Sequence, residues 1–133
     1  MRILVAISLV ALFSQTSGDG TESLHRRGPR GLEGWTISDP IPNEHAMPRT
    51  LVIARDGDLL DRIDGRPLIF TWMFQDDGAH VAYSTGPLRS EELCFLIDTA
   101  TGKEVAHYDC FHDPVAPTAP PWVKLLKQRE LGQ

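Results

Sequence analysis

Hydrophobic positions in the second half of the chain occur in short runs separated by turn-forming residues. Aromatic and β-branched side chains dominate these runs, and Gly, Asp or Pro bounds them. Runs of this kind are typical of strands in an antiparallel sheet. The pattern predicts a β-meander whose strands lie within residues 67–74, 79–85, 93–98 and 103–108.

An additional hairpin is predicted just before the meander. Thr50–Ala54 and Leu59–Ile63 are apolar segments joined through Asp56-Gly57, a dipeptide suited to a tight turn. The sequence therefore predicts a mainly all-β fold, an antiparallel meander of about five to six strands within residues 35–110.

Both faces of the predicted sheet are apolar. Alternate residues of a strand point to opposite faces, and an antiparallel sheet with one wet face shows a clean alternation of apolar and polar residues. Residues 68–74 do not alternate in that way: Leu68, Phe70, Trp72 and Phe74 share one face, and Ile69, Thr71 and Met73 share the other. We therefore expect both faces to be covered, by the chain itself or by another molecule.

The first residues have the layout of a secretory signal peptide. Arg2 gives a positive start, Ile3–Phe13 is apolar, and small residues follow up to Gly18. The apolar run is shorter than the roughly 20 residues that span a bilayer. We expect residues 1–18 to be removed near Gly18, giving an exported protein, periplasmic or secreted, with no stable membrane anchor.

Residues 19–34 are polar, rich in Gly and Arg, and without apolar periodicity, which predicts a flexible leader. Its basic cluster, Arg26, Arg27 and Arg30, is either a solvated tail or a contact for an acidic partner or lipid head groups.

The C-terminal part is predicted to be a proline-rich connector followed by a helix. Residues 111–121 contain Pro114, Pro117, Pro120 and Pro121. Residues 122–131 carry Trp122, Leu125 and Leu126 at helical spacing. A short amphipathic helix of about 10 residues is unstable alone, so we expect it to dock on the sheet or on another molecule.

The two cysteines, Cys94 and Cys110, favour a disulfide in an exported chain. Closing a loop of about 15 residues is worth roughly 3 kcal/mol in the chain-entropy model. If Asp98 and Lys103 close the hairpin, Cys94 lies opposite His107, about 10 Å from the strand position of Cys110. The bridge then requires a bulge or a chain that curls back; free thiols or a bridge between chains are the alternatives.

Charge and motifs restrict the function classes. The chain has a formal net charge of −5 at pH 7, which argues against a nucleic-acid partner. It shows no nucleophile elbow, no glycine-rich phosphate loop and no paired catalytic carboxylates, so it predicts neither an enzyme nor a cofactor. His107, Asp109 and His112 could ligate zinc or copper, or could be ordinary polar residues at a strand end.

The longest connection in the predicted meander is Gly86–Glu92. Long loops on a rigid sheet often carry recognition residues. Arg89, Glu91 and Glu92 are therefore candidate binding residues, and a plain solvated connection is the alternative.

Residues 50–110 resemble one blade of a β-propeller of the TolB-like kind found in exported bacterial proteins. The resemblance rests on Trp72-Met-Phe74, Asp77-Gly78, Val81-Ala-Tyr83 and the Asp98–Lys103 turn. A propeller needs at least four blades, and this chain has room for about two at most. The sheet is then either covered by its own tails or shared between copies, and the resemblance implies nothing about activity.

The sequence therefore predicts an exported, non-catalytic binding or assembly module for a protein or small-molecule ligand. One alternative is a small hydrolase or metal-dependent enzyme that uses the His107–Asp113 end of the sheet. The other is a blade-like unit that functions only as a homo-oligomer.

Overall fold

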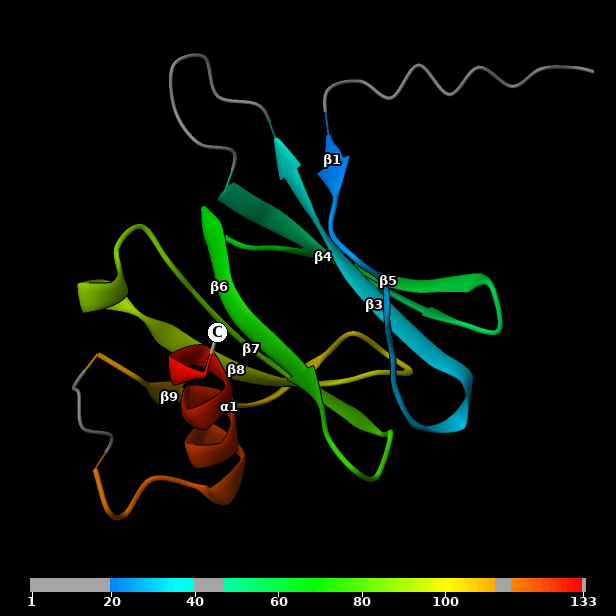
Figure 1. The fold of residues 1–133 in the computed structure, drawn as a ribbon. Helices are drawn as coiled ribbons and strands as arrows, with labels where there is room; N and C mark the ends of the chain where they lie inside the picture. Colours follow the sequence, from blue (N-terminus) through cyan, green and yellow to red (C-terminus); the bar gives the residue numbers. More distant parts are fainter. Residues whose placement is uncertain (1–19, 40–46, 112–115, 133) are drawn as a thin grey trace, which may run out of the picture.

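The computed structural model describes residues 20–39, 47–111 and 116–132, and it is mainly β, as the sequence predicts (Figure 1). The predicted signal peptide, the proposed cut at Gly18 and part of the proline-rich connector lie outside these residues. The described elements are the strands β1 (Thr21–Glu22), β2 (Arg26–Arg27), β3 (Leu32–Asp39), β4 (Met47–Arg55), β5 (Asp58–Asp64), β6 (Leu68–Phe74), β7 (His80–Gly86), β8 (Leu93–Asp98) and β9 (Glu104–Asp109), with the helix α1 (Pro121–Leu131).

The strands form two antiparallel sheets and not a single meander. The N-terminal sheet has the order β1-β3-β4-β5, with β2 also pairing with β3, and the central sheet has the order β6-β7-β8-β9. The N-terminal sheet packs on one face of the central sheet and α1 packs on the other, which gives three layers (Figure 1).

The corner between the sheets explains the difference from the predicted single sheet. After β5 the chain turns at Gly65, whose N–H donates to the carbonyl of Arg49 at 2.7 Å. A Cβ at Gly65 would lie 2.9 Å from that carbonyl oxygen and 2.8 Å from the backbone of Leu68. This close backbone packing fits only glycine, and it sends β6 into a new sheet. A corner of this kind has no distinct signal in hydrophobic periodicity.

The structure describes residues 20–34 of the predicted flexible leader (residues 19–34), and strands within them are instead part of the N-terminal sheet. Its strands β1 and β2 pair with β3, with Arg26 opposite Gly34. The ring of His25 stacks on Trp35 with centroids 4.0 Å apart. Backbone pairing and this stack hold the segment without the apolar periodicity on which the prediction relied.

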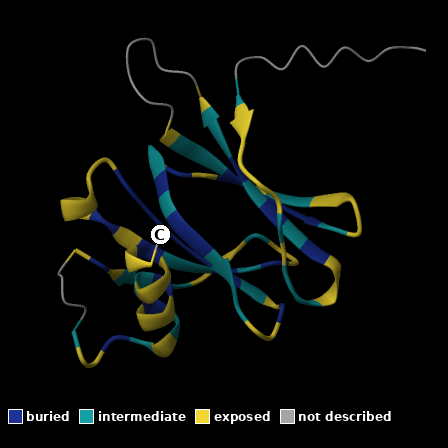
Figure 2. Ribbon diagram, in the orientation of Figure 1, coloured by how far each residue is buried: buried dark blue, intermediate teal, exposed yellow. Residues whose placement is uncertain are grey.

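Two apolar cores confirm the expected cover on both faces of the central sheet. Buried residues lie mainly in the strands between the layers, whereas the outer side of α1 is exposed (Figure 2). The core between the sheets comprises Leu32, Leu51, Ile53, Ile63, Ile69, Trp72, Val81, Tyr83 and Ile97. The core beneath the helix comprises Ala82, Cys94, Cys110, Ala119, Val123 and Leu126. The chain therefore covers its own sheet.

The predicted disulfide between Cys94 and Cys110 is present, with Cα atoms 5.8 Å apart. A bulge between Leu96 and Ile97 shifts the register, so Cys94 lies opposite Tyr108, and the expected pairing with His107 was wrong by one residue. After β9 the chain curls back, and the N–H of Cys110 donates to the carbonyl of Glu92 at 3.1 Å. Bulge and curl together bring the cysteines into bonding range.

The predicted hairpin and C-terminal helix are also confirmed, as β4–β5 and α1. Within the described ranges, no helix is long and apolar enough to cross a membrane.

Candidate functional site

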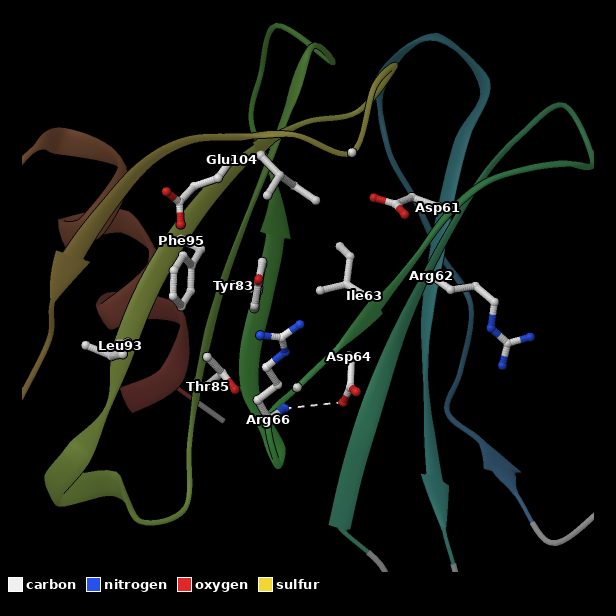
Figure 3. Close-up of a pocket in the computed structure, with 13 residues that line it drawn as sticks. Asp61, Arg62, Ile63, Asp64, Arg66, Tyr83, Thr85, Leu93, Phe95 and Glu104 are labelled. Carbon is white, nitrogen blue, oxygen red and sulfur yellow. Dashed lines mark hydrogen bonds between the residues drawn. The ribbon is translucent and has the colours of Figure 1, made fainter.

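An open cleft lies beside β5, the edge strand of the N-terminal sheet, where the central sheet extends beyond its cover (Figure 3). The cleft has a volume of about 560 Å³. Its lining comes from β5 and the following turn, from β7 and β8, and from the beginning of β9: Asp61, Arg62, Ile63, Asp64, Gly65, Arg66, Tyr83, Thr85, Leu93, Phe95, Ile97, Gly102 and Glu104.

Aromatic side chains form the floor of the cleft. Tyr83 on β7 lies directly opposite Phe95 on β8, and their rings stack with centroids 5.4 Å apart. His107 on β9 extends the row, with its ring 6.4 Å from that of Phe95. Burial raises the pKa of Tyr83, and the negative charges of Glu104 and Asp61 act in the same direction, whereas Arg66 opposes them. The phenol therefore stays protonated at neutral pH and can donate a hydrogen bond.

Carboxylates dominate the rim. Asp61 and Glu104 lie at one end of the cleft, and Asp64 and Arg66 lie at the other, where the backbone N–H of Arg66 donates to Asp64 at 3.4 Å (Figure 3). Arg62 points away from the cleft. The lining carries three carboxylates and two guanidinium groups, Arg62 and Arg66, so negative charge is in excess by one at the cleft.

Gly102 allows a close approach at the acidic end. It has φ +69°, and a Cβ there would lie 2.4 Å from the carboxylate oxygen of Asp61. With glycine, the turn before β9 packs against Asp61 and brings Glu104 to the same end of the cleft.

Thr85 adds a buried polar group without a partner. Its residue is 6% exposed, and its Oγ1 has no hydrogen bond to any described residue. The hydroxyl points into the cleft on the side of Arg66 (Figure 3). Leaving a buried hydroxyl unsatisfied costs about 1–3 kcal/mol, so a bound group that reaches Thr85 would recover part of this energy.

The predicted binding residues Arg89, Glu91 and Glu92 lie elsewhere. Glu92 is 1% exposed and accepts a hydrogen bond from Lys127 Nζ at 3.1 Å. Arg89 lies 3.5 Å from Glu130 of α1, and Glu91 is exposed. Arg89 and Glu92 therefore attach their loop to the helix and do not line the cleft.

The Glu92 contact belongs to a buried charge cluster under α1. Lys127 Nζ also donates to Glu130 at 3.3 Å, and Glu130 is 6% exposed. Burial and, after it, the hydrogen bond with Glu130 raise the pKa of Glu92 to about 7, although Lys127 opposes both effects. The charges of this cluster face one another.

The predicted metal ligands do not form a described metal site. His107 is exposed and lies 3.4 Å from Glu104, Asp109 accepts the N–H of Phe111 at 3.0 Å, and His112 lies outside the described residues. In the described part of the chain, three potential ligand atoms come together at Glu92, Cys94 and Cys110. Both of these sulfurs are in the disulfide, so no thiolate is available for a metal.

Sequence reasoning missed the cleft because its residues come from four separate segments. One signal was present. Asp61 lies two residues before the buried Ile63, and Thr85 lies two residues after the buried Tyr83, so both are polar residues at inward-facing strand positions.

A scan against protein-family models, a search of curated proteins and a search of solved structures found no match to the chain. The central sheet has the sequential strand order expected of one propeller blade, and membership of a propeller stays a prediction.

Proposed function

We propose that the protein is a non-catalytic binding module whose cleft takes a ligand with an amine or guanidinium group on an apolar stem. The observation that carries the proposal is the aromatic floor of Tyr83 and Phe95 beneath a rim with excess carboxylate. The chain is proposed to be exported, with residues 1–18 as its signal peptide; the disulfide supports an oxidising compartment.

Charge and aromatic surface favour the same ligand class. A cation within about 6 Å of an aromatic ring gains roughly 0.5–2 kcal/mol, more when it is desolvated. Asp61 and Glu104 can accept charge-assisted hydrogen bonds at their end of the cleft. An apolar stem can lie along Leu93, which is 44% exposed, and Phe95.

Arg66 already occupies part of the cleft with its own guanidinium (Figure 3). It is exposed, so a ligand cation can displace it at low energetic expense. The ligand is a small molecule or the Lys or Arg side chain of a basic protein segment, and binding requires no cofactor.

Chemical-shift mapping of the ¹⁵N-labelled chain tests the proposal. Agmatine, which carries an amine and a guanidinium on a four-carbon stem, is the probe, and butanediol is the uncharged control. We expect saturable shifts at Tyr83, Thr85 and Phe95 with agmatine alone, with a Kd on the order of 1 mM.

A matched pair of variants identifies the site. Glu104→Gln removes one negative charge from the rim, and Asp58→Asn removes one from the exposed beginning of β5. Weaker agmatine binding in the first variant alone supports the cleft. Equal effects of the two variants, or no saturable shift in the wild type, would contradict the proposal.

A further inference from the structure

A second charged site lies at the opposite edge of the central sheet. β6 is an edge strand, paired on one side with β7, and α1 packs against it (Figure 1). At this edge Arg26 and Arg27 of β2 and Arg129 of α1 line a hollow of about 210 Å³, together with Trp72, Gln75 and Asp76. We call it the arginine hollow.

Arg26 is held in place by β6. Its guanidinium lies over the ring of Trp72, 4.2 Å from the centroid, and donates to the carbonyl of Trp72 at 3.3 Å. Trp72 is itself fixed by close packing, because a Cβ at Gly34 would lie 2.6 Å from its ring. The cationic group is therefore preorganised on a rigid surface.

The arginine hollow has cations without counterions. Among the described residues, no carboxylate lies within 4.0 Å of a side-chain nitrogen of Arg26, Arg27 or Arg129 to form an ion pair. Asp76 lines the hollow but forms no such pair, and the buried Nε2 of Gln75 lacks a hydrogen-bond acceptor. Burial lowers the pKa of Arg26 to about 10, and repulsion from Arg129 adds to the effect.

We propose that the arginine hollow binds a phosphate group. Guanidinium groups donate pairs of parallel hydrogen bonds to phosphate oxygens, and a phosphate monoester carries about 1.5 to 2 negative charges at pH 7. Three guanidinium groups against one carboxylate, Asp76, leave an excess of two positive charges at the hollow, which this dianion matches. The inference is independent of the proposed cleft ligand, because the two sites share no lining residue.

Titration with inorganic phosphate tests the proposal, with sodium chloride used to keep the ionic strength constant. The readouts are the indole and backbone ¹⁵N shifts of Trp72 and the backbone shift of Gln75. We expect saturable binding, and we expect Arg129→Gln to lower the affinity roughly tenfold or more. The side chain of Arg129 is exposed, so the substitution should leave the fold intact. Arg26→Gln should weaken binding similarly. Lys103→Gln, which removes one positive charge from the exposed turn before β9, should leave phosphate binding unchanged.

Vesicles distinguish two sources of the same group. If the protein floats with phosphatidic acid vesicles but not with phosphatidylcholine vesicles, and Arg129→Gln abolishes this flotation, the ligand is a lipid-borne phosphate. Binding of inorganic phosphate without flotation would assign a free phosphate-bearing molecule. A phosphate response that does not saturate at constant ionic strength, or that persists unchanged in Arg129→Gln, would overturn the proposal.

Discussion

The two faces of the central sheet differ in whether their charged groups are paired within the protein. Under α1, the buried carboxylates of Glu92 and Glu130 share the ammonium group of Lys127. On the other face, the carboxylates of Asp61 and Glu104 line an open cleft, where the hydroxyl of Thr85 has no described partner. The first face is covered by a helix and a disulfide, and the second is covered by the N-terminal sheet except at the cleft.

We infer from this difference that one face contributes to stability and the other to ligand binding. Charges that satisfy one another inside the protein fix the position of an element, here α1 and the loop before β8. Polar groups beside the cleft that lack a partner retain hydrogen-bonding capacity for a ligand. Substitutions on the helix side should therefore change the free energy of unfolding, and substitutions at the cleft should change affinity.

The largest difference in the free energy of unfolding is expected between substitutions of two leucines. Leu126, on the buried side of α1, is 0% exposed, whereas Leu93 is 44% exposed at the cleft. Leu126→Ala should lower the free energy of unfolding by about 2–5 kcal/mol, because it removes apolar contacts and leaves a cavity. Leu93→Ala should lower it by less than about 1 kcal/mol. Urea unfolding measures both, and similar losses would contradict the proposed division between the faces.

The disulfide should contribute the next largest effect. Cys94→Ala combined with Cys110→Ala opens a loop with a sequence separation of 16. The chain-entropy model predicts a loss of about 3 kcal/mol in the free energy of unfolding. Urea unfolding of the double variant, compared with the oxidised wild type, gives this value. Agmatine binding by the folded variant should be unchanged, because neither cysteine lines the cleft.

The Glu92 cluster should make stability depend on pH. The pKa of Glu92 in the folded state, about 7, exceeds the ordinary value of 4.5, so the folded protein binds this proton more tightly than the unfolded chain. The resulting stabilisation is complete below about pH 4.5 and is lost as the pH rises through 7.

Glu92→Gln isolates that contribution. The wild type should lose stability on the order of 2 kcal/mol relative to this variant between about pH 5 and pH 8. Thermal unfolding across this range gives the difference, and Glu91→Gln, at the exposed neighbouring residue, is the control. Parallel pH curves for Glu92→Gln and the wild type would refute the assigned pKa.

Thr85→Val should have the smallest effect on stability. The substitution replaces a buried hydroxyl that lacks a described partner with a methyl group of similar size. The free energy of unfolding should stay the same or increase by up to about 1 kcal/mol, whereas agmatine affinity should fall. A loss of more than about 1 kcal/mol would show that the hydroxyl is already satisfied in the free protein.

Much of the fold follows from the sequence. The β4–β5 hairpin, the strands of the central sheet, α1 and the disulfide appear where local patterns place them. The division into two sheets does not, because it depends on tight backbone packing at Gly65. The strands β1 and β2 in the predicted flexible leader do not follow from the sequence either, because strand pairing at a sheet edge needs no apolar pattern.

The candidate site was less predictable than the fold. Loop length identified Arg89 and Glu92, but their contacts with α1 arise only when the helix docks. Asp61, Thr85 and Glu104 meet only after two sheets have packed. A site whose residues come from different layers cannot be predicted from residue spacing within one segment.

Calorimetric titration of agmatine tests the central claim most directly. Wild type, an Asp61→Asn/Glu104→Gln double variant and the Asp58→Asn control are compared at low and moderate salt. We expect the double variant to bind at least about tenfold more weakly, the control to match the wild type, and salt to weaken wild-type binding. Equal affinity for the double variant and the wild type would contradict the cleft as a site for cationic ligands.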